Sequence, residues 1–129
     1  MRFLERFQPQ LLSVLRIVSG LLFLEHGTMK ILHWPVSNMP APPEKFMPVI
    51  IAAGIIELVG GVLVTLGLFT RIAAFIMSGE MAVAYWLVHF GQSGEFFPAR
   101  NGGDAAILFC FIFLFIAAAG PGPWSVDRK

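Results

Sequence analysis

Residues 52–74 read AAGIIELVGGVLVTLGLFTRIAA, an apolar run that holds a single carboxylate, Glu57. The residues three and four positions on either side of Glu57 are all small: Ala53, Gly54, Gly60 and Gly61. Residues at this spacing share one face of a helix, and small residues let a second helix approach closely within a membrane. The stretch therefore predicts a transmembrane helix whose tightest packing face holds an acid, followed by a helical hairpin.

The composition of the whole chain agrees with a membrane protein. Hydrophobic residues make up 57% of the 129 residues, charged residues only 13%, and the mean hydropathy is +0.76. A typical soluble domain carries about 25% charged residues. The net charge of +1 gives no reason to expect nucleic-acid binding, and the lone Cys110 cannot form an internal disulfide.

Four apolar segments are long enough to cross a bilayer, which takes about 20 residues. They cover residues 10–32, 48–69, 71–90 and 103–119. The first has a basic start but no small-x-small cleavage site, so it is read as a retained span. We expect one all-α domain over residues 1–129, an integral membrane four-helix bundle with up-down topology.

The turns contain recognisable helix-start signals. Thr70 is a plausible N-cap of the third span, and Asn101 with Asp104 three residues later resembles a capping box. Gly120 to Pro123 are typical of residues that follow the end of a helix.

Basic residues in the short loops predict the orientation. The side that would hold both termini carries Arg2, Arg6, Arg71, Arg128 and Lys129. The other side carries Lys45 and Arg100, with Lys30 near a helix end. We expect both termini to lie in the cytoplasm of a bacterium, with the protein in its inner membrane.

Ionisable residues inside the spans need partners, because one charge at a helix centre costs about 2.5–3.5 kcal/mol. On the first span, a stripe spaced by three or four residues faces the interior and includes Arg16, Ser19, Phe23, His26, Lys30 and His33. Glu25 lies at the edge of this stripe. Arg16, His26 and Lys30 are the expected counter-charges for Glu57.

The third span adds Glu80, Tyr85 and His89, which could line one wall of a cavity. Two interpretations remain open. Either the charged groups neutralise one another and hold the helices together, or they line a pocket for a small redox-active or protonatable molecule. No pair of histidines and acids has the spacing of a metal site, so no metal is predicted.

Several motifs in the same order resemble the DoxX family of small four-helix membrane proteins. They are LRIVSGLLFLEHGTMKI with His26 and Lys30, the opening stretch 52–74, GEMAVAYWLVH with His89, FFPARNGGDAA, and AAAGPGPWSVDR. The family often has Glu where this chain has Asp104. The resemblance implies a quinone-linked subunit of a membrane oxidoreductase system, working with a partner subunit or as a homo-oligomer, and does not by itself make the chain an enzyme.

On this interpretation Glu57 and Glu80 would be the catalytic proton carriers, and His26, Lys30, Tyr85 and His89 would bind the quinone. Arg16, Glu25, Arg71 and Asp104 would form structural ion pairs. The alternatives are a non-enzymatic assembly subunit, whose charges are purely structural, and a small transporter, whose polar interior is a path.

Overall fold

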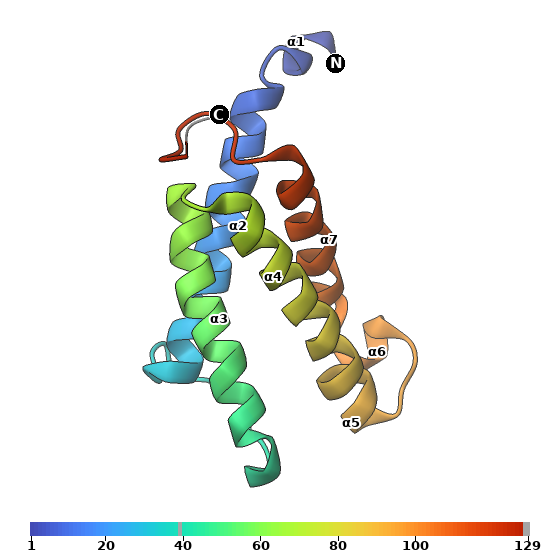
Figure 1. Cartoon of the computed structure of the whole chain (residues 1–129). Helices are drawn as coiled ribbons and strands as arrows, with labels where there is room; N and C mark the ends of the chain where they lie inside the picture. Colours follow the sequence, from blue (N-terminus) through green and yellow to red (C-terminus); the bar gives the residue numbers. More distant parts are fainter. Residues whose placement is uncertain (39, 128–129) are drawn as a thin grey trace.

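The computed structural model describes residues 1–38 and 40–127, and every regular element in that part of the chain is a helix. Four helices are long and lie side by side (Figure 1): α2 (Gln8–Ile31), α3 (Met47–Leu66), α4 (Thr70–Ala84) and α7 (Asp104–Ala119). The short elements are α1 (Arg2–Glu5), the 3-10 helix η1 (Glu44–Phe46), the π-helix η2 (Tyr85–Phe90), α5 (Gly91–Ser93) and α6 (Pro98–Asn101).

Three helical stretches of the described residues are long and apolar enough to cross a membrane. They are Gln8–Ile31, Glu44–Leu66 and Thr70–Ser93, and they match the first three predicted spans. The fourth predicted span corresponds to α7, which has 16 residues. At about 1.5 Å per residue α7 is about 24 Å long, shorter than the hydrocarbon core of about 30 Å. The prediction of full-length spans is therefore confirmed for three helices.

Glycine faces bring α2 and α3 into direct backbone contact. A Cβ atom added at Gly27 would lie 2.4 Å from the backbone N of Leu58, and one added at Gly61 would lie 2.8 Å from Cα of Leu24. Gly60 presents its open side to α4, where a Cβ would lie 2.6 Å from the sulfur of Met77. The glycines around Glu57 thus form a close-packing face, as predicted.

The interior core is apolar, and so is most of the outer surface. The core joins the α2–α3 pair to the α4–α7 pair through side chains that are at most 1% exposed, namely Phe23, Val64, Met77, Phe113 and Ile116. Large apolar side chains point outward on the same helices, including Ile72, Phe75, Leu108 and Phe111. A protein with this surface needs lipid around it.

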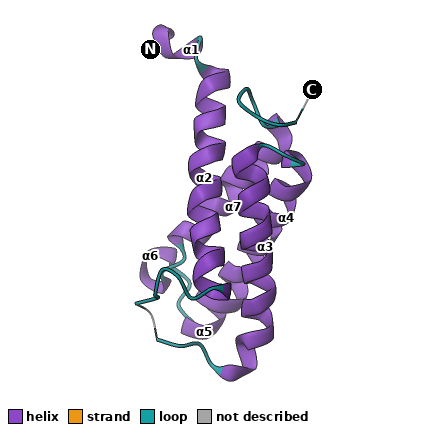
Figure 2. Ribbon diagram, turned by 90° about the vertical axis from the view of Figure 1, so that its left-hand side faces the viewer, coloured by secondary structure: helices purple, strands orange, loops and turns teal. Residues whose placement is uncertain are grey.

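Both termini lie at one end of the helices, together with the turn between α3 and α4 (Figures 1 and 2). We call this the termini end. α5, α6 and the connection from α2 to α3 lie toward the opposite end. Arg128 and Lys129, which contributed to the predicted orientation, are outside the described residues.

The predicted N-caps are wrong at both helix starts. Phe69, in a left-handed conformation with φ of 50°, precedes α4, and the carboxylate of Asp127 accepts the Phe69 and Thr70 amides. The capping box fails because α6 ends at Asn101, two residues too early for α7. Asn101 instead accepts the Gly103 amide at 2.8 Å.

The glycine contacts predict a difference between two matched substitutions. Gly27→Ala inserts a methyl group into the backbone of α3 and should destabilise the protein by about 1–3 kcal/mol, a usual cost of overpacking. Gly79→Ala, where nothing lies within 4 Å of the added carbon, should be neutral or stabilising because alanine favours helix. Thermal unfolding in detergent micelles measures both, and equal stability of the two variants would contradict the close approach.

Candidate functional site

Lys30 and Glu57 form an ion pair between α2 and α3. Lys30 Nζ lies 2.7 Å from Glu57 Oε1, with the lysine side chain 32% exposed and the glutamate 1% exposed. The glycine faces create this geometry, since a Cβ at Gly54 would lie 2.9 Å from Cβ of Lys30. Of the three expected counter-charges for Glu57, the structure places Lys30 against it.

Glu80 of α4 is the third member of this cluster. Its carboxyl group is close enough to interact electrostatically with both Glu57 and Lys30. Glu80 Oε1 is buried and has no hydrogen-bond partner among the described residues. We call Lys30, Glu57 and Glu80 the carboxylate cluster. It places two acids within electrostatic range of one ammonium group.

The predicted stripe on α2 becomes less buried toward the end opposite the termini. Arg16 and Ser19 are buried, His26 and Lys30 are half-buried, and His33 is exposed beyond the end of the helix. The His26 ring packs edge-on against Phe109 of α7, with 6.4 Å between ring centroids. His26 precedes Lys30 by one turn and lies beside the carboxylate cluster rather than in it.

Tyr85 and His89 form a second group with the loop that precedes α7. Tyr85 is buried, and its hydroxyl donates to the Phe96 carbonyl at 3.0 Å and accepts from Asn101 Nδ2 at 3.1 Å. The His89 ring stacks on Tyr85, and its Nδ1 lies 3.4 Å from the Asn101 carbonyl oxygen. Both side chains therefore hold backbone of the loop, and the structure does not bring them to the carboxylate cluster.

Arg16 differs from its predicted role as an ion-pairing residue. It is fully buried, and its guanidinium donates to the carbonyls of Pro121 and Pro123, and to that of Trp124 at 2.7 Å. Backbone carbonyls, rather than a carboxylate in direct contact, accept hydrogen bonds from its two terminal nitrogens, and its buried Nε has no partner among the described residues. Arg16 thus fixes residues 120–127, the C-terminal tail, against α2.

The other three predicted ion-pairing residues also lack a carboxylate or basic partner within the described residues. Arg71 donates to the carbonyls of Ala117 and Ala118, the last residues of α7, where a cation favourably meets the helix dipole. Glu25 and Asp104 are both exposed. The spacing of side chains along the helices could not predict these positions. The partners of Arg71 are main-chain atoms, and Glu25 faces outward.

Asp127 and Ser13 are structurally important residues that the sequence pattern did not single out. Desolvation raises the pKa of Asp127, but hydrogen bonds from Thr70 and the Phe69 amide, with the Arg16 charge, outweigh it and lower the pKa below its usual value. Ser13 donates to the carbonyls of Pro9 and Pro123. The available signal was the sequence GPGP, which turns the chain back after α7 and is followed by an acid at position 127.

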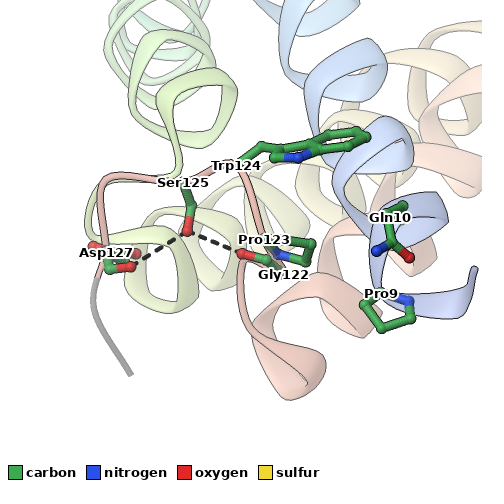
Figure 3. A pocket seen from close by; sticks show the side chains of 7 residues that line it. All are labelled: Pro9, Gln10, Gly122, Pro123, Trp124, Ser125 and Asp127. Atoms are coloured by element: carbon green, nitrogen blue, oxygen red, sulfur yellow. Dashed lines mark hydrogen bonds between the residues drawn. The ribbon is translucent and has the colours of Figure 1, made fainter.

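An open pocket of about 480 Å³ lies between the start of α2 and the C-terminal tail (Figure 3). Its lining residues are Pro9, Gln10, Gly122, Pro123, Trp124, Ser125 and Asp127. It is at the termini end, away from the carboxylate cluster. Among the described residues no three His, Cys, Asp or Glu side chains gather closely enough to hold a metal ion.

Comparison with known proteins identifies relatives of the chain. The family model described as DoxX matches residues 11–90. An "uncharacterized protein" of Haemophilus influenzae is 44% identical over 127 residues, covering 98% of this chain and 95% of that protein. An "uncharacterized membrane protein" of Mycobacterium tuberculosis is 31% identical over 146 residues, covering 99% of this chain and 86% of that protein. No solved structure matches the chain.

Acidification tests the Asp127 cap. Because the pKa of Asp127 is lower in the folded protein, its ionised carboxylate stabilises the fold above about pH 4, the usual range of the unfolded group, and this contribution disappears as the pH falls through the folded pKa. Asp127→Asn should therefore be less stable than the parent by about 1 kcal/mol at neutral pH, the usual value of a helix cap. In acid the parent also loses this contribution, so the two proteins should become equally stable.

Unfolding of the two proteins at a series of pH values measures the difference. Asp104→Asn is the matched control, because Asp104 is exposed at the start of α7 and makes no side-chain cap hydrogen bond there. A constant stability difference between Asp127→Asn and the parent down to acidic pH would contradict the cap.

Proposed function

Because the chain belongs to the DoxX family of membrane proteins, we propose that it is a quinone-linked subunit of a membrane oxidoreductase system. The observation that carries the proposal is the carboxylate cluster. Two acids and one ammonium group meet inside membrane-crossing helices, and one buried carboxyl oxygen has no partner among the described residues. Ionisable groups within spans are functional candidates by default.

The residues present suit the head group of a quinone. Its oxygens accept hydrogen bonds, and the Lys30 ammonium has three N–H donors, of which Glu57 occupies one. The lysine is half-exposed, so its remaining donors can reach a molecule in the membrane. His26, one turn earlier on α2, supplies a further donor beside the same position.

Charge balance assigns different roles to the two acids. One ammonium group neutralises one carboxylate, and Lys30 is hydrogen-bonded to Glu57. Two acids that share a single counter-charge in a weakly polar interior repel each other when both are ionised. Glu80, with its unpartnered oxygen, is the group we assign to hold and transfer a proton.

A bound quinone would supply the redox chemistry, which requires two electrons and two protons for reduction to the quinol. The chain provides protons through Glu80 and orientation through Lys30 and His26. Cys110 stands alone in this sequence, so the electrons come from a partner subunit in this proposal. Tyr85 and His89 act by positioning the loop before α7 rather than by binding the quinone.

We also propose that α7 completes an up-down four-helix arrangement in a bacterial inner membrane. Its outward side chains Leu108, Phe111 and Phe115 are all more than half exposed and apolar, which supports contact with lipid. Gly120 and Pro121 at its end are buried, and this extends the enclosed length beyond 16 residues. The bacterial relatives support the inner membrane.

Quinone binding tests the proposed site. The purified protein should carry, or bind when added, a ubiquinone or menaquinone analogue. Lys30→Met removes the ammonium donors, so it should weaken binding at least about tenfold, the equivalent of one lost hydrogen bond to a charged group. Glu80→Gln keeps the shape of the side chain but replaces the acidic O–H with a weaker amide donor, so it should weaken binding by a smaller factor. Fluorescence quenching of the tryptophans by the quinone measures the affinity.

Glu25→Gln is the matched control, because it makes the same change on α2 at an exposed position. Full binding by both Glu80→Gln and Lys30→Met would reject the site. If the parent binds no quinone while the two variants unfold readily, the cluster serves only to hold the helices together. Solute flux in liposomes containing this protein alone would favour a transporter.

Topology is tested separately with reporters. A fluorescent protein that folds only in the cytoplasm should be active when fused after Asp127 or before Met1, because Arg2, Arg6 and Arg71 at the termini end favour the cytoplasm. The same reporter inserted after Glu44 should be inactive. Opposite locations for the two termini would contradict the fourth crossing by α7.

A further inference from the structure

We infer that the carboxylate cluster is open to the end of the protein opposite the termini and closed from the termini end. This deepens the proposed function, because it assigns the side from which protons reach Glu80. The role of those protons in a quinone reaction rests on the proposed function. The cluster has one partly exposed side, and two successive layers of the protein separate it from the termini end.

The open side follows from unequal helix lengths. Lys30 is one residue before the end of α2, and Ile31 packs where a Cβ at Gly54 would lie. α3 begins at Met47, so about two turns of α3 extend past α2. Among the described residues of the connection, no helix continues from α2 beside this extension. The Lys30 side chain is 32% exposed. Lys30 therefore connects the buried Glu57 to the surroundings on this side.

The first barrier is an apolar layer immediately toward the termini end. Phe23 is two turns before Lys30, Val64 is two turns after Glu57, and Met77 is one turn before Glu80. Because these helices alternate in direction, all three steps lead toward the termini. Phe113 and Ile116 of α7 complete the layer, and all five side chains are at most 1% exposed. The transfer of an ion or a charged group into such an apolar layer has a high free-energy cost.

The second barrier is the C-terminal tail. Arg16 and Ser13 are fully buried under it, and both donate to its carbonyls. The tail amides of Val126 and Asp127 donate to the carbonyls of Leu66 and Gly67 at the end of α3. The tail is thus bonded to both α2 and the α3–α4 turn, and it covers the apolar layer at the termini end.

The arrangement has a chemical consequence for the proposed site. A proton that passes between Glu80 and the oxygen of a bound quinone would enter or leave on the side opposite the termini. At the cluster Glu80 lies within electrostatic range of Glu57 and Lys30, whereas the Arg16 charge and Asp127 lie beyond the apolar layer. With cytoplasmic termini, the protons would be exchanged with the outside of the cell.

Thiol labelling in membrane vesicles tests the inference. In a Cys110→Ala background, Glu80→Cys and Lys30→Cys report access to the cluster. Glu5→Cys marks the termini end, and Lys45→Cys marks the opposite end, since both residues are exposed. The probe is a positively charged, membrane-impermeant methanethiosulfonate, applied to right-side-out and to inside-out vesicles.

We expect both cluster cysteines to react at least about tenfold faster from the side that labels Lys45→Cys, because the charged reagent is strongly disfavoured in the apolar layer. Labelling at comparable rates from both sides, or faster labelling from the Glu5→Cys side, would overturn the inference. If Glu80→Cys does not fold, Lys30→Cys supplies the same comparison. One-sided labelling in a protein that binds no quinone supports the closure and rejects the proposed function, so the two failures are distinguishable.

Discussion

An ionised carboxylate inside hydrocarbon needs a counter-charge within reach, because no bulk water solvates it there. Glu57 is 1% exposed, and Lys30 meets this need at 2.7 Å. The lysine reaches Glu57 because the glycine faces bring the backbones of α2 and α3 together, with Gly27 against Leu58. Helix pairing and charge neutralisation are therefore one arrangement, and the third acid, Glu80, is added to it from α4.

The two ends of the protein satisfy buried polar groups by different means. Toward the side opposite the termini, acids and an ammonium group meet, and one oxygen of Glu80 is left without a partner among the described residues. At the termini end, Arg16 and Arg71 bind backbone carbonyls of the tail and of α7. Carbonyl groups have no proton to exchange near neutral pH, so the termini end suits a permanent structural role, whereas the carboxylate cluster suits chemistry.

The sequence predicted those features that depend on local periodicity. Apolar runs located the helices to within a few residues, and the small residues around Glu57 identified its packing face. The polar stripe on the first span included Lys30 among the expected partners of Glu57. The missed features depend on long-range main-chain contacts. Arg16 binds the carbonyl of Pro121, 105 residues away, and Asp127 caps a helix 57 residues earlier. Every residue has a carbonyl, so no pattern of side chains identifies which one an arginine will bind.

The partners of Arg16 also impose an order on biosynthesis. The ribosome makes Arg16 more than a hundred residues before Pro121 and Trp124. When α2 enters the bilayer, the Arg16 guanidinium has none of the carbonyl partners that it has in the folded protein. Until the tail has been made, water and lipid head groups at the membrane surface are the partners open to Arg16. The first helix to be inserted is thus among the last to be completed.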